Sequence, residues 1–89
     1  MNRIARRDGI DATEVDEDVF LVEPDSEEVF HLNPVAAGLW RLLAEPMTVA
    51  ELQAAVREAF PDRPGAAVDA EVAAAVAELL RRRLALSVP

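Results

Sequence analysis

The chain has 89 residues, no cysteine and a single histidine, which leaves room for one small domain and none for a disulfide framework or a paired-histidine metal site. Its formal net charge is −8, with nine arginines, no lysine and seventeen acidic residues, a balance that repels phosphate backbones and disfavours nucleic-acid partners. Neither a signal peptide nor a membrane span of about 20 apolar residues is evident, so we expect a soluble, cytoplasmic protein.

Residues 1–11 are polar and charged, and they are expected to form a flexible arm before a domain that spans residues 12–89. A first short strand is expected at residues 12–15. Residues 19–22 and 29–32 are apolar runs rich in β-forming residues with a turn-like segment between them, which predicts a hairpin. His31 lies between Phe30 and Leu32 and is expected to point to the opposite face, half exposed.

Three helices should follow the hairpin. Asn33 and Pro34 are typical of a helix N-cap and first turn, and an apolar stripe then continues to about residue 44. Thr48 and Glu51 have capping-box spacing and predict a second helix to about residue 60. Residues 68–84 carry two adjacent apolar stripes, which predicts a third helix with arginines in its final turn.

Strands followed by helices predict an α+β fold, here a small winged-helix-like domain with a two- to three-stranded antiparallel sheet followed by three helices. No phosphate-binding loop, nucleophile elbow or metalloprotease motif is present. A single histidine cannot supply two metal ligands. We therefore expect no enzyme activity, no catalytic residue, no metal and no cofactor.

Six segments of the chain form a recognisable series. They are Val19-Phe20-Leu21-Val22, Val29-Phe30-His31-Leu32-Asn33-Pro34, Trp40-Arg41-Leu42-Leu43, Thr48-Val49-Ala50-Glu51-Leu52, Glu71-Val72 and Leu79-Leu80. Together they resemble the PqqD-like family, whose members are RiPP recognition elements, the peptide chaperones of ribosomally made and modified peptides. The similarity covers about residues 12–88. At the end of the last helix, family members often have a glycine where this chain has Arg83.

The resemblance implies that the leader of a precursor peptide pairs as an extra strand along the third strand, in a groove beside the third helix. An exposed sheet edge offers unpaired backbone groups for such strand addition. The implied partners are the leader and a modifying enzyme or leader peptidase, as in PQQ or lasso-peptide biosynthesis. The residues expected to bind the peptide are Val29, Phe30, His31, Leu32, Ala73, Val76, Ala77, Leu80, Arg81 and Leu84.

Two alternatives remain open at this stage. Strands with three short helices also suit a winged-helix DNA-binding regulator, although the acidic charge and the lack of a basic recognition helix weigh against it. A structural dimerisation domain would use the same sheet edge to pair with a second copy, so the protein is expected to be a monomer or a dimer.

Overall fold

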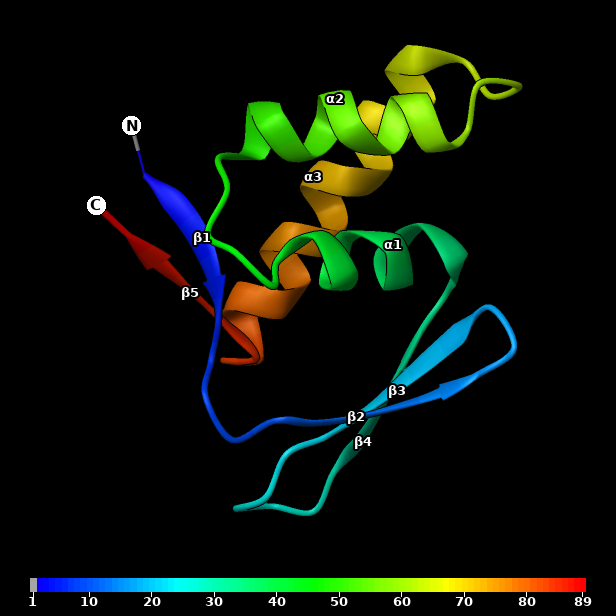
Figure 1. The fold of residues 1–89 in the computed structure, drawn as a ribbon. Coiled ribbons are helices and arrows are strands. Elements are labelled where there is room, and N and C mark those ends of the chain that lie inside the picture. Colours follow the sequence, from blue (N-terminus) through cyan, green and yellow to red (C-terminus); the bar gives the residue numbers. More distant parts are fainter. Residues whose placement is uncertain (1) are drawn as a thin grey trace.

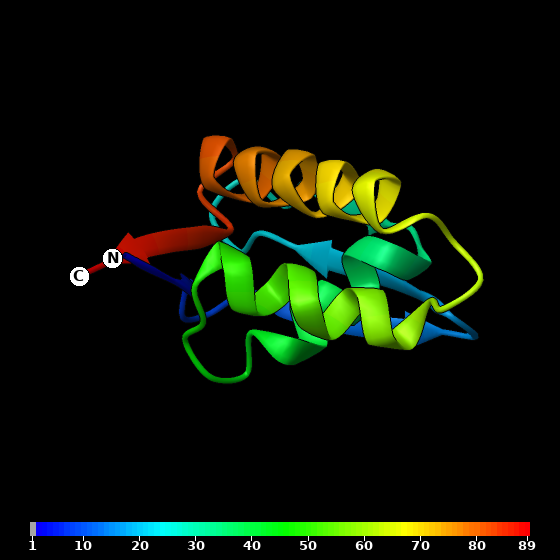
Figure 2. The same cartoon turned by 90° about the horizontal axis from the view of Figure 1, so that it is seen from above.

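The computed structural model describes residues 2–89. The elements in this part of the chain form two antiparallel sheets, one in the order β2-β3-β4 and one of β1 with β5. Figure 1 shows α1 over the three-stranded sheet and α2 farther from it, with α3 running behind both helices so that its last turns reach the level of α1. Viewed from above, α2 and α3 lie side by side (Figure 2). The elements are β1 (Arg3–Arg6), β2 (Asp11–Val15), β3 (Asp18–Val22), β4 (Val29–Leu32), α1 (Pro34–Leu42), α2 (Val49–Ala59), α3 (Gly65–Arg81) and β5 (Ala85–Val88).

The three-stranded sheet has one face in the core and one face outside it. Val19 and Leu21 of β3 are buried, and the register places them opposite Leu32 and Phe30 of β4. His31 is exposed and lies on the outer face. The predicted hairpin and the α+β class are therefore confirmed, with a three-stranded sheet followed by three helices.

Side-chain caps begin the first two helices, as their sequences predict. The Asn33 side chain accepts a hydrogen bond from the Ala36 N–H at 2.9 Å. At α2, the Thr48 hydroxyl accepts from the Glu51 N–H at 3.1 Å, and the Glu51 carboxylate accepts from the Thr48 N–H at 2.9 Å. These bonds satisfy donors that the first helical turn leaves without partners.

The third helix begins and ends three residues earlier than predicted. After α3, the Leu84 N–H donates to the Leu79 carbonyl at 2.9 Å and the Arg83 N–H donates to the Leu80 carbonyl at 3.1 Å. This pair of bonds is a Schellman motif, which requires a left-handed residue just after the helix. Arg83 is that residue, with φ of 60°.

Strands β1 and β5 are the main difference from the sequence prediction. Residues 3–6 were expected to belong to an arm, but they pair with β5 from Arg3↔Val88 to Arg6↔Ala85. Ile4 is only 4% exposed, and its N–H donates to the Met47 carbonyl at 2.6 Å. Such short strands carry little periodic signal, and their partners lie at opposite ends of the chain.

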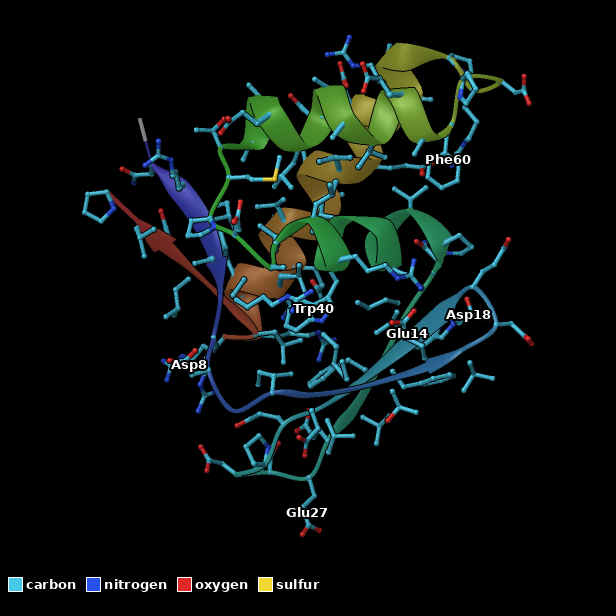
Figure 3. All side chains as sticks on the ribbon, in the orientation of Figure 1. Asp8, Glu14, Asp18, Glu27, Trp40 and Phe60 are labelled. Carbon is cyan, nitrogen blue, oxygen red and sulfur yellow. The ribbon has the colours of Figure 1, made fainter. Side chains whose placement is uncertain are left out.

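Arg6 joins this small sheet to the helices. Its Nε donates to the Trp40 carbonyl oxygen at 2.9 Å, and its guanidinium carbon lies 4.8 Å from the centroid of the Trp40 ring. Partial burial lowers the pKa of Arg6, because burial penalises the charged form. Figure 3 shows Trp40 beneath α1, between the helices and the sheet.

Candidate functional site: the edge of β4 and the groove beside it

β4 is an edge of the three-stranded sheet. The Glu23 N–H donates to the Glu28 carbonyl at 3.1 Å, so these two residues form a hydrogen-bonded pair. Because such pairs alternate with non-hydrogen-bonded pairs along an antiparallel ladder, the next pair, Val22↔Val29, is not hydrogen-bonded. The backbone N–H and C=O groups of Val29 and His31 therefore point away from β3, toward the open edge.

Two cavities border β4 on the side of α3, and we call them together the β4–α3 groove. They meet at Leu32 and Leu79. The first, of about 340 Å³, is lined by His31, Leu32, Asn33, Val35, Ala36, Glu71, Ala74, Ala75, Glu78 and Leu79. The second, of about 450 Å³, is lined by Glu28, Val29, Phe30, His31, Leu32, Glu78, Leu79, Arg82 and Leu84.

The floor of the groove is apolar and its helical rim is ion-paired. Leu32 and Leu79 on the floor are 8% and 3% exposed. On the rim, Glu71 accepts a hydrogen bond from Arg63 at 2.9 Å, and Glu78 pairs with the arginines that end α3. Hydrogen bonds from these arginines hold the pKa of Glu78 below its usual range. The groove therefore offers an apolar surface beside charges that already have partners.

Five of the ten predicted peptide-binding residues line this groove. They are Val29, Phe30, His31, Leu32 and Leu84.

The other five predicted residues border neither cavity. Val76 is in the core, Leu80 packs partly against the core, and Ala73, Ala77 and Arg81 are exposed. The predicted groove between strand and helix therefore fits the geometry, while these five residues lie on other sides of α3 and stay a prediction.

Five other residues of α3, together with Arg82 just after it, line the groove, and the sequence analysis did not name them as site residues. The alanine-rich helix is apolar on several sides, and adjacent residues differ by about 100° around its axis, so the pattern alone did not decide which side meets the strand. The sequence does contain one indication of this face. Glu71, Ala75, Glu78 and Arg82 are spaced i, i+4, i+7 and i+11, which places them on a single side of a helix. The residues are Glu71, Ala74, Ala75, Glu78, Leu79 and Arg82.

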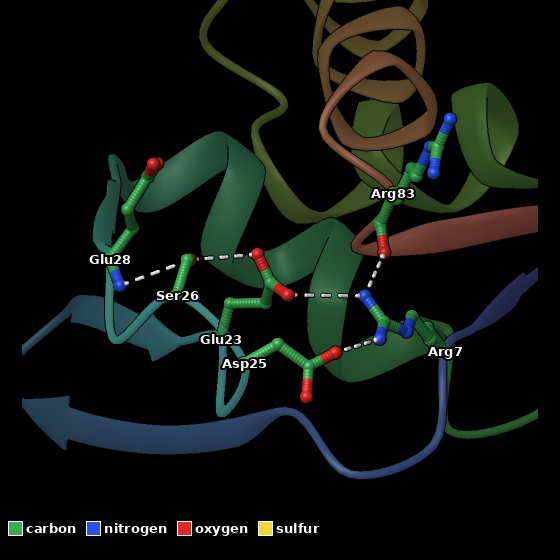
Figure 4. Close-up of polar contacts among 6 residues, drawn as sticks. All are labelled: Arg7, Glu23, Asp25, Ser26, Glu28 and Arg83. Carbon is green, nitrogen blue, oxygen red and sulfur yellow. Dashed lines mark hydrogen bonds and ion pairs between the residues drawn. The ribbon is translucent and has the colours of Figure 1, made fainter.

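A polar cluster holds the turn before β4 against the end of α3 (Figure 4). Arg7 donates to Asp25 at 3.0 Å, to Glu23 at 3.5 Å and to the Arg83 carbonyl at 3.4 Å. Within the turn, the Ser26 hydroxyl donates to Glu23 at 2.9 Å. The cluster thus connects three segments that are distant in sequence and links the turn before β4 to the end of α3.

His31 also has neighbours on the outer side of the sheet. Its Nε2 lies 3.2 Å from an Asp18 carboxylate oxygen, and its ring centroid is 5.1 Å from that of Phe20. Within residues 2–89, no group of three histidine, cysteine or acidic residues is placed to hold a metal ion. In the same part of the chain, no helix combines the length and the apolar character needed to cross a membrane.

A family model matches most of this architecture, from the start of β3 to the first residue of β5. It describes coenzyme PQQ synthesis protein D, PqqD, and it matches residues 18–85. The chain belongs to the PqqD family. The matched PqqD segment contains β4 and α3, and therefore the whole β4–α3 groove; β1 and β2 lie before it.

A solved structure has the same fold as this chain. The chain is similar to TbiB1, whose structure was determined in complex with the TbiA(beta) leader peptide, with a TM-score of 0.77 and 20% sequence identity. The match covers 91% of this chain and 93% of TbiB1. At this identity the likeness shows the fold alone. Comparison with curated proteins finds no match.

Proposed function

We propose that this chain binds the leader region of a ribosomally made precursor peptide as an added strand on β4, and that it delivers the precursor to a modifying enzyme or a leader peptidase. The protein itself acts as a binding module without a catalytic step. The observation that carries the proposal is the open edge of β4 beside an apolar groove. Membership of the PqqD family and the likeness to TbiB1, solved with a leader peptide, support the same role.

The edge provides the directional part of the binding. Val29 and His31 each present one N–H and one C=O, and hydrogen bonds of this kind contribute about 0.5–1.5 kcal/mol each. An extended peptide satisfies these groups in register, as in other cases of β-augmentation. Backbone bonds of this kind bind any extended chain, so they supply affinity without selecting a sequence.

The groove provides the selective part. Side chains of a bound strand alternate between its two faces, so one set points toward α3. An aliphatic or aromatic leader side chain fits the first cavity, where Leu32, Val35 and Leu79 form the floor. A few such anchors carry most of the energy of a small interface, and an affinity of about micromolar strength is expected.

An NMR titration with a synthetic leader of a candidate precursor peptide from the same genome tests the proposal. The backbone amides of residues 29–32 and of the groove-facing part of α3 should shift, while those of α2 should not. A leader of scrambled sequence serves as the control. Absence of any shift at β4 with the natural leader would remove the site.

One competing role uses the same edge. An open strand also pairs with a second copy of its own chain, which would make the protein a structural dimer. Light scattering over a dilution series separates the two roles, because a peptide-binding monomer keeps its mass at every concentration. Nucleic-acid binding has less support, since ten of the seventeen acidic residues lie between residues 8 and 28, in a segment without arginine.

A further inference from the structure

Within residues 2–89, no helix covers the outer face of the three-stranded sheet, which carries the apolar side chains of Phe20, Val22 and Val29. The register places Thr13, Phe20 and His31 in one row across the three strands, and Val22 and Val29 in the next. α1 packs on β3 and β4 from the opposite side, where the helices lie in Figure 1. Val29 is 61% exposed, and Val15, farther along β2, is 51% exposed. We call this surface the outer sheet face.

Acidic residues frame the outer sheet face at both ends. Asp11 and Asp18 belong to its rows, Asp16 lies in the turn between β2 and β3, and Glu27 lies in the turn before β4. Figure 3 shows Asp18 and Glu27 near opposite ends of the sheet. Among residues 2–89, no arginine forms an ion pair with Asp11, Asp16 or Glu27. These three acidic residues therefore have no cationic partner in the described part of the chain, while Asp18 lies beside His31.

We propose that the outer sheet face docks the enzyme that receives the precursor, through an apolar patch flanked by basic side chains on that enzyme. This inference rests on the proposed function and names the surface used for delivery. An apolar centre with a charged rim is the usual composition of a protein interface. The acidic frame selects a basic partner and speeds its approach. A second copy of this chain would present the same acidic frame and be repelled.

The proposed leader site on the edge of β4 adjoins the outer sheet face. Val29 and His31 direct their backbone groups to the open edge while their side chains lie on the outer sheet face. A peptide added to β4 extends the sheet by one strand, so half of its side chains join this face. A docked enzyme then contacts both proteins, and the loaded complex binds it more tightly than the empty one. By linkage, the enzyme strengthens leader binding by the same factor.

The test measures two affinities for each variant of the full chain by calorimetry. The first is for the synthetic leader, and the second is for the purified modifying enzyme or leader peptidase that acts on the same precursor. Val15→Arg places a cation on the outer sheet face, on the strand farthest from β4. Ala54→Arg adds the same charge at an exposed position of α2 and is the matched control. We expect Val15→Arg to weaken enzyme binding at least about tenfold, and both variants to bind the leader as the wild type does.

Salt dependence and neutralisation test the acidic frame. Asp16→Asn removes a charge and suits the positive φ of 55° at this position, and it should slow association with the enzyme and reduce its salt dependence. The proposal is overturned if Val15→Arg binds the enzyme as tightly as Ala54→Arg, or if the leader-loaded wild type does not bind it. A wild type that does not bind the leader would instead contradict the proposed function. Enzyme binding that depends on Val15 would in that case still support the outer sheet face as the docking surface.

Discussion

The guanidinium carbon of Arg82, just after α3, lies 4.9 Å from the centroid of the Phe30 ring in β4. Both residues line the second cavity of the β4–α3 groove. A cation over an aromatic face contributes about 0.5–1 kcal/mol at an exposed site. This contact therefore connects the strand edge to the helix and bridges the groove near one end.

Arg82→Ala should lower the free energy of unfolding by about 0.5–1 kcal/mol more than Arg81→Ala does. Both arginines pair with Glu78, so Arg81→Ala is a control that also removes one ion pair. Only Arg82 lies over the Phe30 ring. Urea denaturation of the two variants measures the difference. Equal destabilisation would show that the ring contact contributes nothing.

His31→Pro should weaken leader binding at least about tenfold while the domain stays folded. Proline removes the N–H that faces the open edge, and no bond to β3 is lost because His31 and Phe20 are a non-hydrogen-bonded pair. His31→Ala keeps the N–H and is the matched control, with near-normal affinity. Fluorescence anisotropy with a labelled leader measures both, and circular dichroism checks the fold. Unchanged affinity of His31→Pro would mean that the leader does not pair with this edge.

Ala74→Phe should reduce leader binding, because Ala74 lines the first cavity and the ring would occupy it. Ala73→Phe is the matched control on the adjacent, exposed position, which borders neither cavity, and its affinity should stay within about twofold of the wild type. The same anisotropy assay compares them. The opposite result would favour the helix face that contains Ala73 and Ala77, as the sequence predicted.

Arg83→Gly should stabilise the protein by about 0.5–1 kcal/mol. Arg83 has φ of 60°, a conformation that is costly for residues with a Cβ and natural for glycine. Its side chain is exposed, and its carbonyl, which accepts from Arg7, is kept in the variant. Arg83→Ala also loses the side chain but keeps a Cβ, so it should not gain stability in urea denaturation. A gain of the same size in Arg83→Ala would point to the side chain instead.

The free energy of unfolding should decrease in acid because Glu51 and Glu78 become protonated. Hydrogen bonds from the Thr48 backbone and hydroxyl hold the pKa of Glu51 below its usual range, and those from Arg81 and Arg82 do so for Glu78. Each carboxylate has a lower pKa in the folded state than in the unfolded state. Its ionised form therefore stabilises the fold at pH values above the ordinary pKa of about 4.3. This stabilisation is lost as the pH falls through the lowered pKa of the folded state.

Unfolding in urea between about pH 6 and about pH 3 measures this effect. Glu51→Gln keeps an acceptor oxygen for the capping box but no longer titrates, so its stability should depend less steeply on pH than that of the wild type. Glu78→Gln should behave in the same direction. Identical pH profiles for the wild type and the double variant would contradict the assignment.

Local patterns were enough to predict the hairpin and the starts of the first two helices. Asn33 and Thr48 act on backbone groups within three residues, and the alternation of Phe30, His31 and Leu32 follows from the two-residue period of a strand. The open edge of the strand at residues 29–32 also followed from the sequence, through its resemblance to the PqqD-like family. These features depend on residues close together in the sequence or on a short sequence motif, so they can be recognised without knowing the tertiary structure.

Other features were decided only by tertiary structure. β1 and β5 pair because folding brings Ile4 beside Met47 and Ser87, and no pattern within either four-residue segment encodes that partner. The choice of Ala74 over Ala73 as a groove residue depends on how α3 is rotated when it docks. An alanine-rich helix has small apolar side chains on several faces, so its sequence permits several rotations, and packing against α2 and β5 selects one.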